Sequence, residues 1–171
     1  ATMSAWVKPV SGQTSPAGTI LFIDRAGGSA TRMLISVNND LTVSVKARSN
    51  AESPLPAFTT IETIPLDTWT HIVGVVSLSS MTAFIYINGQ LSRSGSLPFT
   101  QTTFATSSAT NPGIGGIYNV ANYYFKGLID EAAMFPRVLS SGDVSKLYNG
   151  SRPTSFNASF GVNDTPVGKY V

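Results

Sequence analysis

Only two places in the sequence carry side chains typical of catalytic or metal-binding sites. One is Asp130-Glu131, the only adjacent acidic pair, and the other is His71, the only histidine. Neighbouring residues on a strand point to opposite faces, so Asp130 and Glu131 reach one substrate only across a bulge. A glycosidase needs two carboxyls that flank one bond at about 5–9.5 Å. The pair therefore favours a structural role, in which Asp130 or Glu131 accepts hydrogen bonds from nearby backbone amides.

His71 lies in the apolar run WTHIVG, without a second histidine or an evident nucleophile. The run is typical of a strand, and a histidine inside it is predicted to be packed and hydrogen-bonded. The sequence contains no cysteine, so it lacks the set of sulfur and imidazole ligands with which proteins build zinc sites. These residues predict neither a catalytic histidine nor a zinc centre.

The composition favours a protein whose surface carries few charges. Charged residues make up 12% of the 171 residues, about half of the roughly 25% usual in soluble domains. Such a surface suits an extracellular or particle-bound protein, or a subunit that buries several faces against neighbours; an ordinary neutral domain stays open. The net charge is only +2 and the basic residues are scattered, which disfavours nucleic acid as a partner. No apolar run approaches the roughly 20 residues of a membrane span.

Short β-like runs separated by turn residues dominate the sequence. The residues Asn38-Asn39-Asp40 and Asn88-Gly89 each predict a tight hairpin, and Asn-Gly is the strongest such signal because both residues tolerate positive φ. This spacing predicts an all-β, antiparallel sandwich rather than alternating strands and helices. The predicted strands lie within residues 1–9, 19–27, 31–40, 41–49, 68–78, 81–95, 111–119 and 122–135.

One short helix is predicted after residue 140. Ser140 is placed to cap it, with Asp143 as the acidic member of a capping box. Val144, Leu147 and Tyr148 share one face, and Gly150 follows as a stop signal. We expect this helix to pack against the sheet edge or the mouth of the sandwich. Residues 1–150 are then one domain, and residues 151–171 are a C-terminal extension, either one added strand (SFNASFGV) or an assembly arm.

Five segments in order resemble the laminin-G-like, concanavalin-A-like jelly-roll family. The resemblance covers residues 1 to about 149 and implies two curved antiparallel sheets packed face to face, with Trp6 and Trp69 anchoring the core. It also implies that Gly127 allows a close approach of two strands and that Leu139 and the helix cover one end. The segments are SAWVKP (4–9), DTWTHIVGVV (67–76), AFIYINGQL (83–91), GIGG (113–116) and FKGLIDEAAMFPRVLSSGDVSKLY (125–148).

One departure concerns the beginning of the fold. Family members usually have a strand before the SAWVKP segment, whereas this sequence begins at Ala1 without Met, as a processed product or a piece of a longer protein would. Lacking that strand would expose unpaired backbone groups. Three repairs are open: the C-terminal segment folds into the gap, a neighbouring subunit donates a strand, or the missing strand lies upstream.

The resemblance also implies a calcium site and disfavours glycoside hydrolysis. Many laminin-G-like domains bind calcium at the sandwich rim through an Asp and backbone carbonyls, oxygen ligands that suit this ion. Asp130 is the residue that would be carried over, with Glu131 second. Glycoside hydrolases of the same fold carry three acidic residues at alternating positions of one strand. No such pattern occurs here, so we expect no enzymatic activity.

Residues 115–124 (GGIYNVANYY) are the candidate ligand-contacting segment. Their Tyr and Asn side chains suit sugar recognition, because aromatic faces stack on sugar rings and amides bind hydroxyls; they suit a protein interface equally well. A solvated loop with packed tyrosines is the plain alternative. The candidates for ligand contact are Tyr118, Asn119, Asn122 and Tyr123.

Two functions follow. The first is a non-catalytic binding or structural module at the cell surface, outside the cell or on a virus particle, as part of a larger assembly that recognises carbohydrate or protein. The second is an accessory carbohydrate-binding domain of a secreted carbohydrate-active enzyme. The sequons that begin at Asn149, Asn157 and Asn163 also arise by chance in a chain rich in Ser, Thr and Asn.

Overall fold

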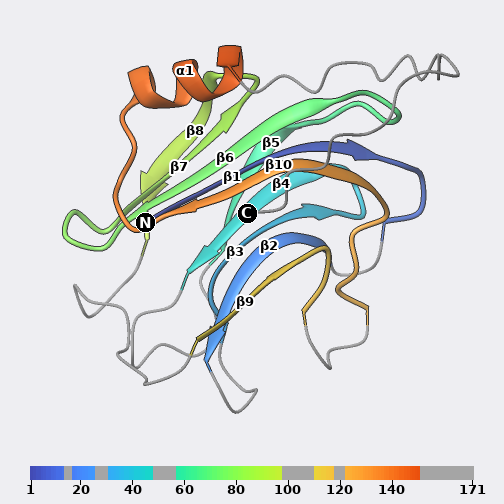
Figure 1. Ribbon diagram of the computed structural model, residues 1–171, viewed down its shortest axis with the longest axis horizontal. Helices are drawn as coiled ribbons and strands as arrows, with labels where there is room; N and C mark the ends of the chain where they lie inside the picture. The colour runs from blue at the N-terminus through green and yellow to red at the C-terminus, as the bar shows by residue number, and fades with distance from the viewer. Residues whose placement is uncertain (14–16, 26–30, 48–56, 98–109, 118–121, 151–171) are drawn as a thin grey trace, which may run out of the picture.

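The protein is a sandwich of two antiparallel five-stranded sheets with one helix on the outside (Figure 1). The computed structural model describes residues 1–13, 17–25, 31–47, 57–97, 110–117 and 122–150. This arrangement confirms the predicted all-β, jelly-roll class. In the described part of the chain, no helix is long and apolar enough to cross a membrane.

Each sheet contains strands from distant parts of the chain. Sheet A has the order β10-β1-β6-β7-β8 and sheet B the order β5-β4-β3-β2-β9. The strands of sheet A are β1 (Thr2–Pro9), β6 (Thr70–Ser77), β7 (Thr82–Ile87), β8 (Gln90–Ser96) and β10 (Gly127–Phe135). Those of sheet B are β2 (Ala17–Arg25), β3 (Thr31–Asn38), β4 (Thr42–Ala47), β5 (Ala57–Thr63) and β9 (Thr110–Ile114).

The core lies between the sheets because the strands alternate. In β1, Met3, Ala5 and Val7 face sheet B, whereas Ser4 and Trp6 lie on the outer face. The same alternation in β4 sends Val43, Val45 and Ala47 inward. Trp6 is buried as predicted, but it lies outside the inter-sheet core. The prediction for Trp69 is wrong, because this residue precedes β6 and is only half-buried.

Both predicted hairpins are present. Asn88 and Gly89 have φ of 50° and 78°, the positive values that a tight β7–β8 turn requires. The β3–β4 turn is closed by the Leu41 N–H, which donates to the Asn38 carbonyl at 3.0 Å. Strand β5 was not predicted, because the tripeptide Pro54-Leu55-Pro56 before it and its mixed polar sequence hide the alternation.

The first strand, β1, is fully integrated in sheet A. It pairs with β10 on one side and β6 on the other, and its Ala1 N–H and carbonyl extend the β6 ladder to Val76. The edges of the two sheets are instead β10 and β8 in sheet A, and β5 and β9 in sheet B. Among the described strands, β1 is therefore a central strand and not an edge.

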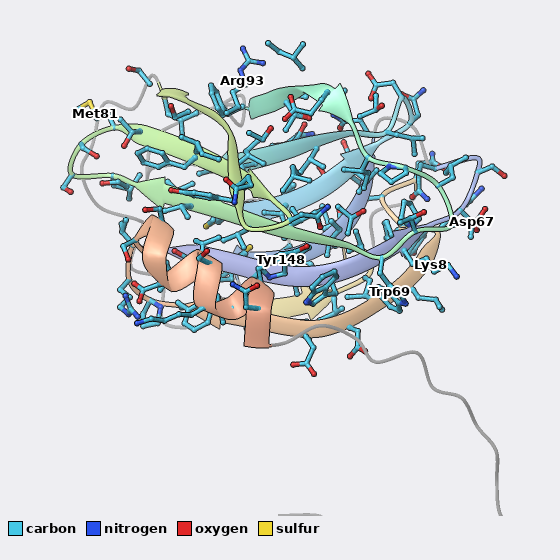
Figure 2. All side chains as sticks on the ribbon, turned by 90° about the horizontal axis from the view of Figure 1, so that it is seen from above. Lys8, Asp67, Trp69, Met81, Arg93 and Tyr148 are labelled. Carbon is cyan, nitrogen blue, oxygen red and sulfur yellow. The ribbon has the colours of Figure 1, made fainter. Side chains whose placement is uncertain are left out.

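The helix α1 (Ser141–Gly150) begins with the predicted capping box. The Asp143 N–H donates to Ser140 Oγ at 3.1 Å, and the Ser140 N–H donates to Asp143 Oδ2 at 3.1 Å. Val144 and Leu139 pack on Val73 and Tyr86 of sheet A. The helix thus covers the outer face of sheet A (Figure 2), rather than one end of the sandwich as predicted.

Candidate functional site

The only histidine is buried beneath α1. His71 is 1% exposed, and its Nε2 lies 2.9 Å from Ser4 Oγ. The ring packs against Trp6 and Tyr148, which stack on each other with centroids 5.5 Å apart. Burial lowers the pKa of His71 to about 4, so the imidazole is neutral at pH 7. The predicted packed and hydrogen-bonded role of His71 is confirmed, and the Ser4–His71 pair is closed to substrate.

The acidic pair lies on a bulge of β10. Ser4 pairs with Ala133 but Trp6 pairs with Asp130, so two residues of β10 stand opposite Ala5. Glu131 has a φ of 48°, and its N–H donates to Asp130 Oδ1 at 2.8 Å. The predicted hydrogen bond between this pair and the backbone is therefore present. The bulge is the exception to strand alternation that the sequence argument left open at Asp130-Glu131.

Calcium binding at Asp130 and Glu131 stays a prediction. Both residues are exposed, and one carboxylate oxygen is already engaged by a backbone N–H. Calcium takes six to eight oxygen ligands. Within the described ranges, no three His, Cys, Asp or Glu side chains come together to hold an ion. We therefore assign no role to calcium in the steps below.

Chelation provides a direct check. We expect excess EDTA, and separately about 1 mM calcium, to leave the melting temperature of the purified chain unchanged. A bound ion would stabilise the folded state by mass action, with about 2.7 kcal/mol gained at a hundredfold excess over Kd. Differential scanning calorimetry measures this, and a rise of several degrees with calcium that Asp130→Asn abolishes would contradict the expectation.

Two of the four predicted ligand-contacting residues, Asn122 and Tyr123, lie in the described part of the chain. Asn122 is exposed with a φ of 67°, and Tyr123 is half-buried against Phe22, Leu34 and Ile117 on the outer face of sheet B. The Tyr123 carbonyl accepts the Thr19 N–H at 3.0 Å, which fixes the segment along β2. Tyr123 thus follows the packed-tyrosine alternative. The other two candidates, Tyr118 and Asn119, lie outside the described residues.

The next residue, Tyr124, is the surface aromatic that the sequence reasoning missed. It is 53% exposed, and its ring lies so close to the Gly116 backbone that a Cβ there would come within 2.5 Å of it. The Phe125 N–H donates to the Gly115 carbonyl at 2.9 Å and holds the two stretches together. A ring supported on one side and exposed to solvent is a platform for stacking. Alternation along Asn122-Tyr123-Tyr124 would have predicted it, since one of two adjacent tyrosines must point outward.

Beside this platform, a row of hydroxyl groups crosses the outer face of sheet B. Thr19, Ser36, Ser44 and Thr59 are aligned in register on four neighbouring strands. Asn38 Nδ2 donates to Ser44 Oγ at 2.8 Å. The hydroxyls of Thr19 and Ser36 are buried and make no hydrogen bond in the described structure. Their unused bonding capacity is a cost that a water or ligand hydroxyl in contact would remove.

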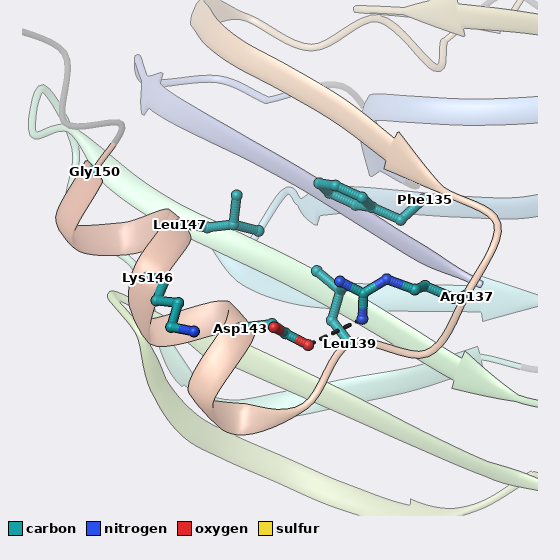
Figure 3. A pocket seen from close by; sticks show the side chains of 7 residues that line it. All are labelled: Phe135, Arg137, Leu139, Asp143, Lys146, Leu147 and Gly150. Carbon is teal, nitrogen blue, oxygen red and sulfur yellow. Dashed lines mark hydrogen bonds and ion pairs between the residues drawn. The ribbon is translucent and has the colours of Figure 1, made fainter.

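A hollow of about 360 Å³ lies between α1 and the end of β10 (Figure 3). Its charged residues are Arg137, Lys146 and Asp143, with Arg137 Nη1 at 3.0 Å from Asp143 Oδ2. The Arg137 hydrogen bond and the Ser140 N–H hold the pKa of Asp143 down at about 2. Because the Asp143 carboxylate in this hollow caps the helix, we assign the hollow a structural role and not a binding role.

Comparison with known families now places the fold. The family model described as the concanavalin A-like lectin/glucanases superfamily, Laminin_G_3, matches residues 1–145. The chain belongs to this superfamily. The resemblance predicted from the five sequence segments is thereby confirmed.

Solved structures with this superfamily's fold include sugar-binding domains. Domain 4 of a GH43 extracellular arabinanase from Geobacillus stearothermophilus, in complex with arabinotriose, is 27% identical with a TM-score of 0.61, over 86% of this chain and 65% of that one. The sialidase CBM40 of Ruminococcus gnavus has a TM-score of 0.69 at 14% identity, over 86% and 81%. A heptameric SAP-like pentraxin from Limulus polyphemus has a TM-score of 0.65 at 18% identity, over 86% and 68%. The last two establish the fold alone, and a search of curated proteins finds no match.

Proposed function

We propose that this chain is a non-catalytic carbohydrate-binding module that works outside the cell. The observation that carries the proposal is the exposed Tyr124 ring, held on the Gly116 backbone next to the exposed amide of Asn122. A rigid aromatic ring offers apolar area for the C–H face of a sugar at little cost in side-chain entropy. The amide supplies hydrogen bonds to sugar hydroxyls.

The comparisons support this reading. The arabinanase domain was solved with arabinotriose, and the sialidase CBM40 was also solved with α2,3-sialyllactose. Both are parts of carbohydrate-active enzymes by their descriptions, which favours the accessory-domain function over the virion or assembly subunit. The extracellular location is proposed on the same ground.

A non-enzymatic role agrees with the chemistry of the described residues. His71 and Ser4 are buried under α1. The exposed carboxylates Asp130 and Glu131 lie on β10, an edge strand of sheet A, whereas the Tyr124 segment lies along β2 of sheet B. Among the described residues, a substrate at Tyr124 would therefore meet no acid and base pair. We infer binding without turnover.

The test is a glycan array followed by isothermal titration with arabinotriose, sialyllactose and any further hit. We expect a saturable ligand whose affinity falls at least about tenfold in Tyr124→Ala, equivalent to 1.4 kcal/mol of lost stacking. Tyr124→Phe keeps the ring and should retain most of the affinity. The matched surface control is Ile61→Ala, which removes another exposed apolar side chain, 83% exposed on β5, and should bind normally. Equal affinity of Tyr124→Ala and the native chain, or no glycan bound at millimolar concentration, would rule the proposal out.

A further inference from the structure

The two sides of the sandwich, where the edge strands of the sheets face each other, differ in their contacts. On one side β5 and β8 are clasped together: the Arg93 guanidinium donates to the Thr59 carbonyl and lies 4.9 Å from the centroid of the Phe58 ring. Ser92 Oγ donates to Glu62 beside them. Figure 2 shows Arg93 at this side, opposite β9 and β10. These contacts join the edge strands of the two sheets and close the core there.

On the opposite side the sheets remain apart. A cavity of about 270 Å³, here called the β9–β10 slot, lies between their edge strands. An apolar cavity of about 150 Å³ already accepts a benzene ring, so the slot has room for an aromatic side chain. Ile114, at its rim, is 61% exposed. The slot is lined by Leu21, Pro112, Gly113, Ile114, Ala132, Ala133 and Met134.

One half of the β10 edge is open to pairing. The half that contains Asp130 and Glu131 carries two exposed charges and a bulge, which are devices that block the addition of a strand. The half from Ala133 to Phe135 has neither. Across the slot, Pro112 removes a backbone donor from β9, as is typical of an edge that stays unpaired. The acceptor edge is therefore Ala133–Phe135 of β10.

We propose that the chain's own residues 155–162 (SFNASFGV) dock on this acceptor edge as an added strand and fill the β9–β10 slot. In an extended segment the side chains alternate, so one face of SFNASFGV is wholly apolar and the other is polar or glycine. That pattern matches an edge position with one face over the slot and the other in water. The apolar face consists of Phe156, Ala158, Phe160 and Val162.

The start of the tail favours this occupant over a second copy. Gly150, where α1 ends, lines the same hollow as Phe135, the last residue of β10 (Figure 3). The four residues 151–154 can span about 14 Å when extended. A strand supplied from within the chain also has the advantage of high effective concentration, which a second molecule lacks.

The absence of cysteine in the sequence permits a clean cross-linking test in the full chain. Ala133→Cys is combined with Asn157→Cys in one variant and with Ser159→Cys in another, so that both neighbouring registers are sampled on the polar face. We expect an intrachain disulfide in at least one, because it forms only when the Cα atoms approach to about 4.4–6.8 Å. The matched control pairs the same tail cysteines with Ile61→Cys on the clasped side, where no cross-link should form.

Hydrogen exchange gives an independent measurement without cysteines. The outward amides of Ala133–Phe135 should exchange at least about tenfold faster in the double variant Phe156→Ser/Phe160→Ser than in Ser159→Ala, which alters only the polar face. An intrachain cross-link together with this change supports the proposal. A disulfide-linked dimer would overturn it in favour of a second copy, and equal cross-linking to Ile61→Cys, no cross-link, or unchanged exchange would overturn it outright.

Discussion

Gly127→Ala is expected to lower the free energy of unfolding by about 3–5 kcal/mol. Gly127 has a φ of 145°, a backbone conformation that residues with a Cβ rarely adopt. Holding alanine in this conformation costs about 1–3 kcal/mol. A Cβ there would also lie 2.2 Å from the Lys8 carbonyl oxygen, and overpacking adds about 1–3 kcal/mol. Lys8 belongs to β1, which is held between β10 and β6 and cannot move aside.

Urea denaturation followed by circular dichroism measures this loss. The matched control is Gly150→Ala, because no atom lies within 4 Å of the added methyl group and alanine suits a helix better than glycine by up to about 1 kcal/mol. We expect the control to be as stable as the native chain or slightly more so. Similar midpoints for the two variants would show that β1 and β10 do not approach as closely as described.

Acidification from pH 7 to pH 4.5 should cost about 2–3 kcal/mol through His71 alone. Its pKa is about 4 in the folded chain and about 6.5 when unfolded. Between these values the unfolded state binds the extra proton, so stability falls as the pH falls through this range and levels off below pH 4. The group is 1% exposed, and a proton would place an uncompensated charge beneath α1.

His71→Gln isolates this contribution. The glutamine amide retains the capacity to bond to Ser4 Oγ but does not titrate. We expect a variant that is less stable than the native chain at pH 7 but whose stability changes by about 2–3 kcal/mol less between pH 7 and 4.5. The Asp143 carboxyl, with a pKa of about 2, loses its stabilising effect only at lower pH and does not confuse the comparison. Parallel pH profiles for the two chains would contradict the buried, neutral histidine.

Features set by neighbouring residues were predictable from the sequence. The Asn88-Gly89 turn and the Ser140–Asp143 capping box each depend on a few adjacent side chains, and both are present. His71 was correctly predicted as a packed residue because a strand pattern surrounds it.

Features set by distant partners were not predictable. The bulge at Glu131 arises from the pairing of β10 with β1, two strands more than a hundred residues apart, and no local signal marks it. The hydroxyl row, in contrast, could have been predicted in part, because the alternation of β4 places Ser44 on the opposite face from Val43 and Val45.

The position of α1 over Trp6 has a spectroscopic consequence. Of the two tryptophans, Trp6 is stacked on Tyr148 of the helix, whereas Trp69 directly precedes β6 and is half-buried. Release of the helix would bring water to the indole of Trp6. Intrinsic fluorescence of a Trp69→Phe chain would thus report the attachment of α1 separately from the melting of the sandwich.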